Sequence, residues 1–172
     1  MSPNVEEPAA RAHRLLDASG ATVATAESLT GGRLAAALTA DPGASRTYVG
    51  GVVAYATSVK VAVLGVPQSL VDGPGVVSAE CARAMADGVR GLTGATYALS
   101  TTGVAGPDSQ DGRPPGTVYV GLAGPGHSVA IVLELSGDRA AIQERTAREA
   151  LSALCDRLRS MAREPEDDSA LG

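Results

Sequence analysis

A hydroxyl and two glycines mark a predicted strand–turn–helix junction near the N-terminus. Residues 25–33 read Thr-Ala-Glu-Ser-Leu-Thr-Gly-Gly-Arg, between a β-branched run at 22–25 and a helix-forming run at 34–38. Glycine lets backbone N–H groups approach a ligand closely, and a helix start adds free N–H groups and a positive dipole end. This turn suits a phosphate or the oxyanion of an acyl-transfer reaction; alternatively, Ser28 or Thr30 only caps the helix.

Lys60 is the only lysine, and the rest of the 14 basic residues are arginines. Arginine stays charged in proteins, whereas a buried lysine can lose its proton. A single lysine within the apolar segment 59–64 is therefore a candidate general base, although an isolated surface lysine is the alternative. A Ser–Lys pair can activate a hydroxyl where no histidine serves, so Ser28 is the candidate nucleophile. Tyr55 is placed to hydrogen-bond to either group.

Neither the cysteines nor the histidines form a pattern of their own. Cys81 and Cys155 lie far apart in helix-like segments, so we expect small buried hydrophobic residues rather than metal ligands. His13 and His127 are also scattered and indicate no Ser-His-Asp arrangement. We expect neither a metal nor a cofactor.

Bulk properties limit the class of protein. The 172 residues carry a net charge of −5, with 44% hydrophobic residues, which favours one folded domain and argues against broad nucleic-acid binding. No apolar run approaches the roughly 20 residues of a membrane span, and the N-terminus does not resemble a secretory signal. We therefore expect a cytoplasmic protein without a membrane partner, and a homodimer is plausible for a domain of this size.

Hydrophobic periodicity and turn residues predict alternating strands and helices, followed by a late hairpin. This pattern predicts a three-layer α/β/α sandwich with a mixed sheet over residues 1–163, followed by an acidic disordered tail at 164–172. The loop 103–116 is long enough to suggest a function. The expected strands are 22–26, 48–55, 95–101, 117–122 and 128–135; the expected helices are 8–19, 31–39, a short one from 57 or 58, 78–92 and a last one from Gly137 or Asp138.

Seven motifs in order resemble the CinA C-terminal domain family, in its stand-alone form, from about residue 8 to residue 160. They are Thr-Ala-Glu-Ser-Leu-Thr-Gly-Gly at 25–32, Gly-Gly-Val-Val-Ala-Tyr at 50–55, Lys60 with Leu-Gly-Val at 64–66, Val-Ser-Ala-Glu at 77–80, Thr-Gly-Val-Ala-Gly-Pro at 102–107, Pro-Gly-Thr-Val-Tyr at 115–119 and Gly-Asp-Arg at 137–139.

This resemblance implies a nicotinamide-mononucleotide amidohydrolase with a five-stranded mixed sheet. The family hydrolyses the nicotinamide carboxamide to give nicotinate mononucleotide and ammonia. The resemblance implies that Ser28 is the nucleophile, that Lys60 is its base, that Tyr55 helps to order the pair and that Thr102 lies beside it. Leu29 stands where many members have Cys, which affects the shape of the pocket but not the Ser28 chemistry.

The substrate requires an oxyanion site and a phosphate site. Backbone N–H groups near Ser28, Gly31 and Gly32 are candidates for the oxyanion, and Thr30 lies in the same turn. Glu27 either orients Lys60 or faces solvent.

The phosphate candidates are the glycines Gly103 and Gly106 together with an arginine. Arg139 at a helix start is the first choice, and Arg46 is the second. Two other functions remain open: a non-catalytic nucleotide-binding module, and a partner subunit of a larger assembly.

Overall fold

Five strands form one mixed sheet in the computed structural model, which describes residues 6–164. The strand order is β2-β1-β3-β4-β5. β1 is parallel to both β2 and β3, whereas β4 is antiparallel to β3 and β5. The strands are β1 (Val23–Glu27), β2 (Tyr48–Val53), β3 (Tyr97–Gly103), β4 (Thr117–Gly124) and β5 (His127–Glu134). The predicted mixed sheet is confirmed.

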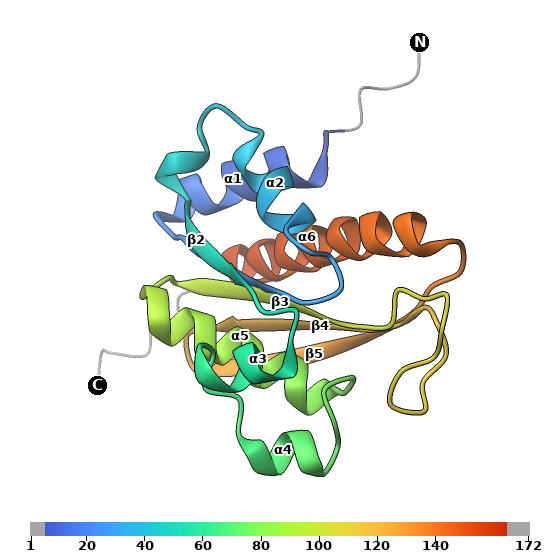
Figure 1. The fold of residues 1–172 in the computed structure, drawn as a ribbon. Coiled ribbons are helices and arrows are strands. Elements are labelled where there is room, and N and C mark those ends of the chain that lie inside the picture. Colours follow the sequence, from blue (N-terminus) through green and yellow to red (C-terminus); the bar gives the residue numbers. More distant parts are fainter. Residues whose placement is uncertain (1–5, 165–172) are drawn as a thin grey trace.

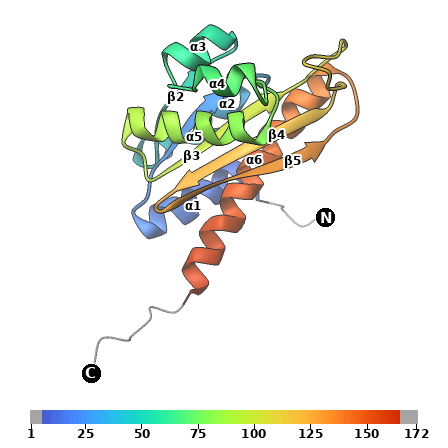
Figure 2. The same cartoon turned by 90° about the horizontal axis from the view of Figure 1, so that it is seen from below.

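Helices cover both faces of the sheet, as Figures 1 and 2 show. One face carries α5, with α3 and α4 beside it, and the other carries α1, α2 and the long α6. The predicted three-layer arrangement is therefore confirmed. The helices are α1 (Pro8–Ser19), α2 (Arg33–Thr39), α3 (Thr57–Ala62), α4 (Gln68–Asp72), α5 (Ala79–Thr93) and α6 (Arg139–Arg163), with a 3-10 turn at Ala44–Arg46.

The core consists of two apolar clusters, one on each face of the sheet. Leu16, Leu34 and Leu154 belong to the cluster under α1, α2 and α6, and Met85 belongs to the cluster under α5. Every residue of β1 is buried because this strand is central and is covered on both faces. The carboxyl end of β1 is therefore held rigidly, and the Ser28 turn begins there.

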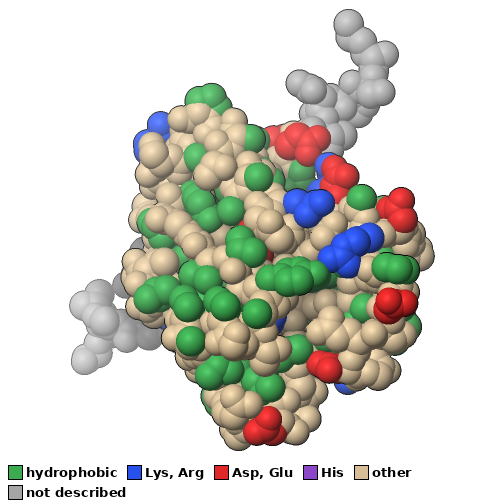
Figure 3. All heavy atoms as spheres, viewed as in Figure 1, with side chains coloured by type: hydrophobic (Ala, Val, Ile, Leu, Met, Phe, Trp, Pro, Cys, Tyr) green, Lys and Arg blue, Asp and Glu red, His purple; other side chains and the backbone are tan. Residues whose placement is uncertain are grey.

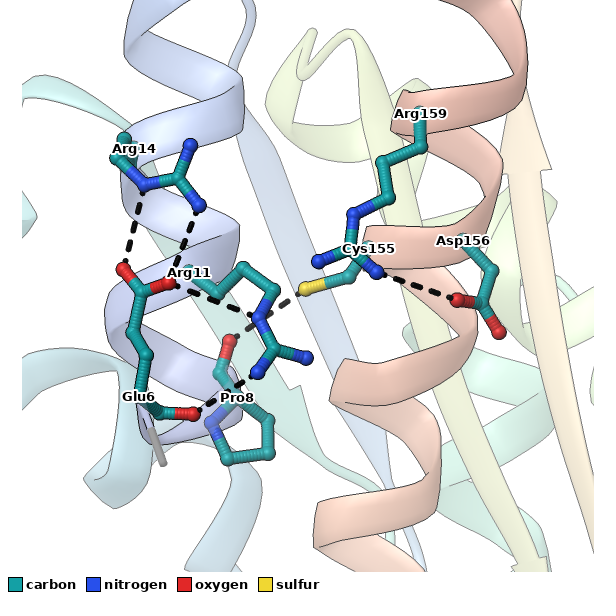
Figure 4. Close-up of polar contacts among 7 residues, drawn as sticks. All are labelled: Glu6, Pro8, Arg11, Arg14, Cys155, Asp156 and Arg159. Carbon is teal, nitrogen blue, oxygen red and sulfur yellow. Dashed lines mark hydrogen bonds and ion pairs between the residues drawn. The ribbon is translucent and has the colours of Figure 1, made fainter. Parts of the chain in front are cut away.

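Polar contacts join α1 to Glu6, which precedes it in the chain, and to α6 (Figure 4). The Glu6 carboxylate accepts hydrogen bonds from Arg14 at 3.1 and 3.3 Å, and the Arg11 guanidinium lies 3.6 Å away. The Cys155 thiol is 3.5 Å from the Pro8 carbonyl oxygen. Both cysteines are buried and free, as the sequence predicted, and burial raises the pKa of the Cys155 thiol.

Most element boundaries agree with the sequence within about two residues, and α1 has the predicted bounds. The expected caps at Ser78 and Asp138 are present, since each side chain accepts a hydrogen bond from the backbone N–H of the third residue of its helix. The short helix α4 was missed because Pro67 and Gly73 flank only five residues and this segment reads as a loop. The predicted acidic tail lies outside the described residues, apart from Glu164. Across residues 6–164, no helix combines the length and apolarity that crossing a bilayer requires.

Candidate active site

Ser28 and Lys60 meet at the carboxyl end of the parallel strands. Ser28 directly follows β1, and Lys60 lies in α3, which begins shortly after β2. Lys60 Nζ is 2.9 Å from Ser28 Oγ. The exposed fractions of the two residues are 2% and 8%, so the predicted pair exists in an environment that largely excludes water.

Two backbone carbonyls hold the Lys60 amine. Nζ donates to the Ala54 oxygen at 2.8 Å and to the Tyr55 oxygen at 3.0 Å. An ammonium has three donors, and the third is directed at Ser28 Oγ. When the amine loses one proton, its two remaining N–H groups can keep both carbonyls, which leaves the lone pair facing the hydroxyl.

Burial lowers the pKa of Lys60 because the charged form loses hydration. Among residues 6–164, no carboxylate forms an ion pair with this amine. The neighbouring Cys81 thiol does not oppose the effect at neutral pH, since burial raises its pKa to about 11 and keeps it uncharged. The surroundings of Lys60 therefore favour a neutral base.

The turn after β1 is fixed by hydrogen bonds on both sides of Ser28. The Ser28 N–H donates to the Thr101 carbonyl at 2.9 Å, and the Ser28 carbonyl accepts from the Gly31 N–H at 3.0 Å. These two N–H groups are therefore already used, which corrects the expectation that they bind the oxyanion. Because a trans peptide places N–H and C=O on opposite sides, the Leu29 N–H points away from Gly31.

Glu27 neither orients Lys60 nor faces solvent. It is 1% exposed, and its carboxylate accepts hydrogen bonds from the N–H groups of Leu34 and Ala35 at the start of α2, at 2.7 and 3.1 Å. It also accepts from the Thr30 hydroxyl at 2.7 Å. Glu27 thus supplies the acceptors for the start of this helix, which the sequence had assigned to Ser28 or Thr30, and Ser28 is free for chemistry.

The two glycines of the turn allow backbone conformations with positive φ angles. Gly31 and Gly32 have φ angles of 57° and 104°, and Gly32 is the N-cap residue directly before α2. Neither glycine lines the pocket at Ser28, and Thr30 is fully buried against Glu27 and Thr101. The expected direct contact of these three residues with substrate is therefore not supported by their positions.

A pocket of about 430 Å³ opens beside Ser28. Figure 1 shows the loop 103–116 next to the start of α6, and Figure 2 shows the same neighbourhood from below. On the face drawn in Figure 3, basic side chains gather over α2 and the start of α6, and acidic side chains lie on both sides of them. The pocket is lined by Ser28, Leu29, Tyr55, Gly103, Val104, Ala105, Gly106, Pro107, Asp108, Ser109, Gln110 and Arg139.

Arg139 connects two walls of this pocket. Its Nη1 donates to the Gly106 carbonyl at 2.6 Å, and its Nη2 donates to the Tyr55 hydroxyl at 2.8 Å. The Tyr55 ring is 60% exposed. Tyr55 therefore helps to hold the Lys60 amine, as expected, but through its backbone carbonyl, whereas its hydroxyl contacts Arg139.

Gly103 must be glycine at the base of the loop. Its φ is 154°, and a Cβ at this position would lie 2.5 Å from the Thr117 carbonyl oxygen. The close approach of β4 leaves no room for a side chain at this position, which lines the pocket.

Two expected site residues do not line this pocket. The buried Thr102 hydroxyl donates to the Val76 carbonyl at 2.5 Å and does not line the pocket. Arg46 precedes β2 and pairs with Asp17 at 3.4 Å. Since β1 and β2 are parallel, Arg46 lies at the amino ends of these strands, roughly 16 Å from the Ser28 end for a five-residue strand.

Sequence reasoning missed Gln143, which supports the Ser28 turn from α6. Its Nε2 donates to the Leu29 carbonyl at 2.9 Å, and the side chain is buried. Gln143 follows Arg139 by four residues, so both project from one face of the helix. A polar residue on the apolar face of α6 was the available signal. No group of three metal-ligating side chains occurs anywhere in the described part of the chain.

Comparison of the sequence with known proteins identifies its family. Residues 5–158 match the family model described as the CinA C-terminal domain. The chain belongs to the CinA C-terminal domain family. It is 53% identical over 129 residues to a CinA-like protein of Frankia casuarinae, covering 75% of this chain and 30% of that protein. A CinA-like protein of Anaeromyxobacter sp. is 49% identical over 140 residues, covering 81% of this chain and 34% of that protein. The chain thus spans about a third of the length of these relatives.

Solved structures of CinA proteins share the fold. A competence-damaged protein (CinA) superfamily protein from Klebsiella pneumoniae has a TM-score of 0.88 at 35% identity, covering 92% of this chain and 99% of that one. A competence/damage inducible protein from Agrobacterium tumefaciens has a TM-score of 0.83 at 32% identity, with coverage of 92% and 99%. These likenesses extend over almost the whole of both solved chains.

Proposed function

We propose that this CinA domain is an amidohydrolase that converts nicotinamide mononucleotide to nicotinate mononucleotide and ammonia. The observation that carries the proposal is the 2.9 Å contact between Ser28 Oγ and a buried Lys60 whose pKa is lowered. A serine hydroxyl next to a neutral amine is suited to acyl transfer. The resemblance of the sequence to the amidohydrolase family supplies the substrate class.

The reaction proceeds through an ester of Ser28. The neutral Lys60 amine takes the Ser28 proton as Oγ attacks the carboxamide carbon, and the carbonyl oxygen becomes an oxyanion. Lys60 returns this proton to the departing amide nitrogen, so ammonia leaves and a nicotinoyl ester remains. A water molecule then attacks the ester with Lys60 as its base, and the serine leaves with the proton.

The Leu29 N–H is the best placed oxyanion donor in the turn. Leu29 lines the pocket, and its N–H forms no hydrogen bond with any other residue of the 6–164 range. A donor from the residue after the nucleophile is a recurring arrangement in serine hydrolases. Removing one such donor costs about 100- to 1000-fold in rate.

Arg139 is the candidate phosphate ligand. Its guanidinium lines the same pocket as Ser28 and is held by Gly106 and Tyr55 rather than by a carboxylate. Arginine binds phosphate through charge-assisted hydrogen bonds. The position of Arg46 behind the amino ends of the strands removes it as a candidate.

Ammonia release from nicotinamide mononucleotide tests the proposal. Purified protein should release ammonia and nicotinate mononucleotide in equal amounts, and Ser28→Ala should abolish both while still binding substrate. Ser45→Ala, at an exposed serine in the turn before β2, is the matched control and should retain full activity. Binding without ammonia release would instead favour a non-catalytic nucleotide-binding module.

A further inference from the structure

An exposed acidic residue that the mechanism does not use lines the pocket beside Ser28. Asp108 lines the pocket, as Arg139 does. Within residues 6–164, Asp108 forms neither a hydrogen bond to another side chain nor an ion pair. Arg139 donates instead to a carbonyl and to a phenol. Opposite charges therefore share one pocket without pairing, and each is left free for a ligand.

Arg139, Asp108 and Ser28 each suit a different chemical group of a ligand. A phosphate is attracted to Arg139 and repelled by Asp108, whereas the reacting carboxamide must reach Ser28. An ionised carboxylate only accepts hydrogen bonds, so its natural ligand is a group with free O–H or N–H donors. In a pyridine mononucleotide, the part between the carboxamide and the phosphate is a sugar with two adjacent hydroxyls.

We propose that Asp108 determines specificity by accepting hydrogen bonds from the ribose hydroxyls of the substrate. The inference rests on the proposed function and narrows its substrate class to ribonucleotides over sugars without vicinal hydroxyls. An acidic side chain serves the same purpose for ribose in dinucleotide-binding folds. Asp108 acts on binding of the sugar, not on the bonds that change at Ser28.

The position of Asp108 on the loop supports this role. The loop leaves β3 at Gly103, passes the Arg139 contact at Gly106 and reaches Asp108 two residues later. The carbonyl that fixes the guanidinium and the free carboxylate therefore belong to one short segment. Arg139 holds this segment in place, so the distance between the phosphate site and the hydroxyl site is set by the protein before substrate arrives.

The experiment compares three variants with two substrates. The substrates are nicotinamide mononucleotide and its 2′,3′-dideoxy analogue, and the variants are Asp108→Ala, Asp108→Asn and the control Asp111→Asn. Asp111 lies on the same loop, is exposed and does not line the pocket. Asparagine also suits its φ of 50°, so the control changes the same charge without new strain.

Asp108→Ala should raise KM for the ribonucleotide by about 10- to 100-fold, the effect of losing hydrogen bonds to a charged group, with kcat changed less than about threefold. Asp108→Asn should have a smaller effect because it keeps one neutral acceptor. For the dideoxy analogue, wild type should already show the raised KM, and Asp108→Ala should add little. Equal effects on both substrates would overturn the inference and indicate attraction of the pyridinium charge. No effect on either substrate would also overturn it.

A binding titration separates this inference from the proposed function. The Ser28→Ala protein is titrated with both nucleotides, with and without Asp108→Ala. If wild type releases no ammonia, the proposed function fails; a preference for the ribonucleotide that disappears with Asp108→Ala would still support the inference. If neither nucleotide binds, both fail.

Discussion

Replacing Lys60 gives the sharpest test of the chemistry. Lys60→Met removes the amine but keeps an unbranched side chain of similar length. Among residues 6–164, the only side chain that hydrogen-bonds to Ser28 Oγ is Lys60, so no neighbouring base can substitute for it. General-base catalysis contributes about 100- to 10,000-fold, and we expect the upper part of this range, about 1000-fold or more in kcat. This loss corresponds to roughly 4 kcal/mol of transition-state stabilisation.

Lys60→Arg is the matched control, because it keeps a cation and its donors but cannot become neutral. We expect Lys60→Arg to lose activity as Lys60→Met does, which would exclude a purely electrostatic role. The double variant with Ser28→Ala should be no slower than either single variant, since groups that act as a unit are not additive. Ammonia release is measured with pyridine mononucleotide in excess, on variants whose folding is checked by circular dichroism.

The pH dependence tests the same reasoning independently. The wild-type kcat/KM should rise with pH through a pKa below the ordinary lysine value of 10.5, and Lys60→Arg should lose this limb. A Lys60→Met protein with more than a tenth of wild-type activity would refute the assignment of the base. So would a double variant whose loss equals the product of the two single losses.

The lowered pKa also predicts how stability varies with pH. The unfolded chain binds more protons than the folded chain between the lowered pKa of Lys60 and the ordinary value. The contribution of Lys60 to stability is therefore fully present above a pH of about 10.4, and it is lost as the pH falls through the folded-state pKa. The free energy of unfolding, measured by urea melts at several pH values across this range, should rise more steeply with pH for wild type than for Lys60→Met. The same pH dependence for both proteins would contradict the burial argument.

Three further changes have distinct expected effects. Arg139→Met should raise KM for the mononucleotide by about 10- to 100-fold but barely affect the riboside, and Arg46→Met should affect neither; equal losses for both substrates would remove Arg139 from the phosphate site. Gln143→Met, which leaves the buried Leu29 carbonyl without its donor, should lower kcat more than it raises KM in steady-state assays. Glu27→Gln should destabilise the fold by about 1–3 kcal/mol in denaturant melts, because its amide hydrogens would face the N–H groups of α2.

Local patterns were sufficient to predict the layers and most elements. The helix α1 starts with Pro8 and stops at Gly20, and both signals are local. The Ser78 and Asp138 caps are local as well. The short helix α4 lacked such a signal because it is only five residues long, too short for a hydrophobic period to be recognised.

The dyad was predicted from residue type, because a single lysine among arginines is a chemical signal independent of the fold. The partners of the remaining side chains were not predictable in this way. Glu27 caps α2 across an intervening turn, and Gln143 reaches Leu29 from a segment 114 residues away. Arg46 and Arg139 cannot be distinguished by composition; only the parallel register of β1 and β2 places Arg46 at the wrong end.

The Lys60 amine is held by the main chain, through the carbonyls of Ala54 and Tyr55, and every residue type carries a carbonyl. These two contacts therefore depend on the path of the backbone and not on the chemistry of either side chain, although Ala54 is also buried in the apolar core. Tyr55 thus has two separate tasks: its backbone carbonyl holds the Lys60 amine, while its hydroxyl accepts a hydrogen bond from Arg139 at the other side of the pocket. Under the proposed function, the pocket around the amide substrate could therefore change while the contacts that hold Lys60 beside Ser28 remain.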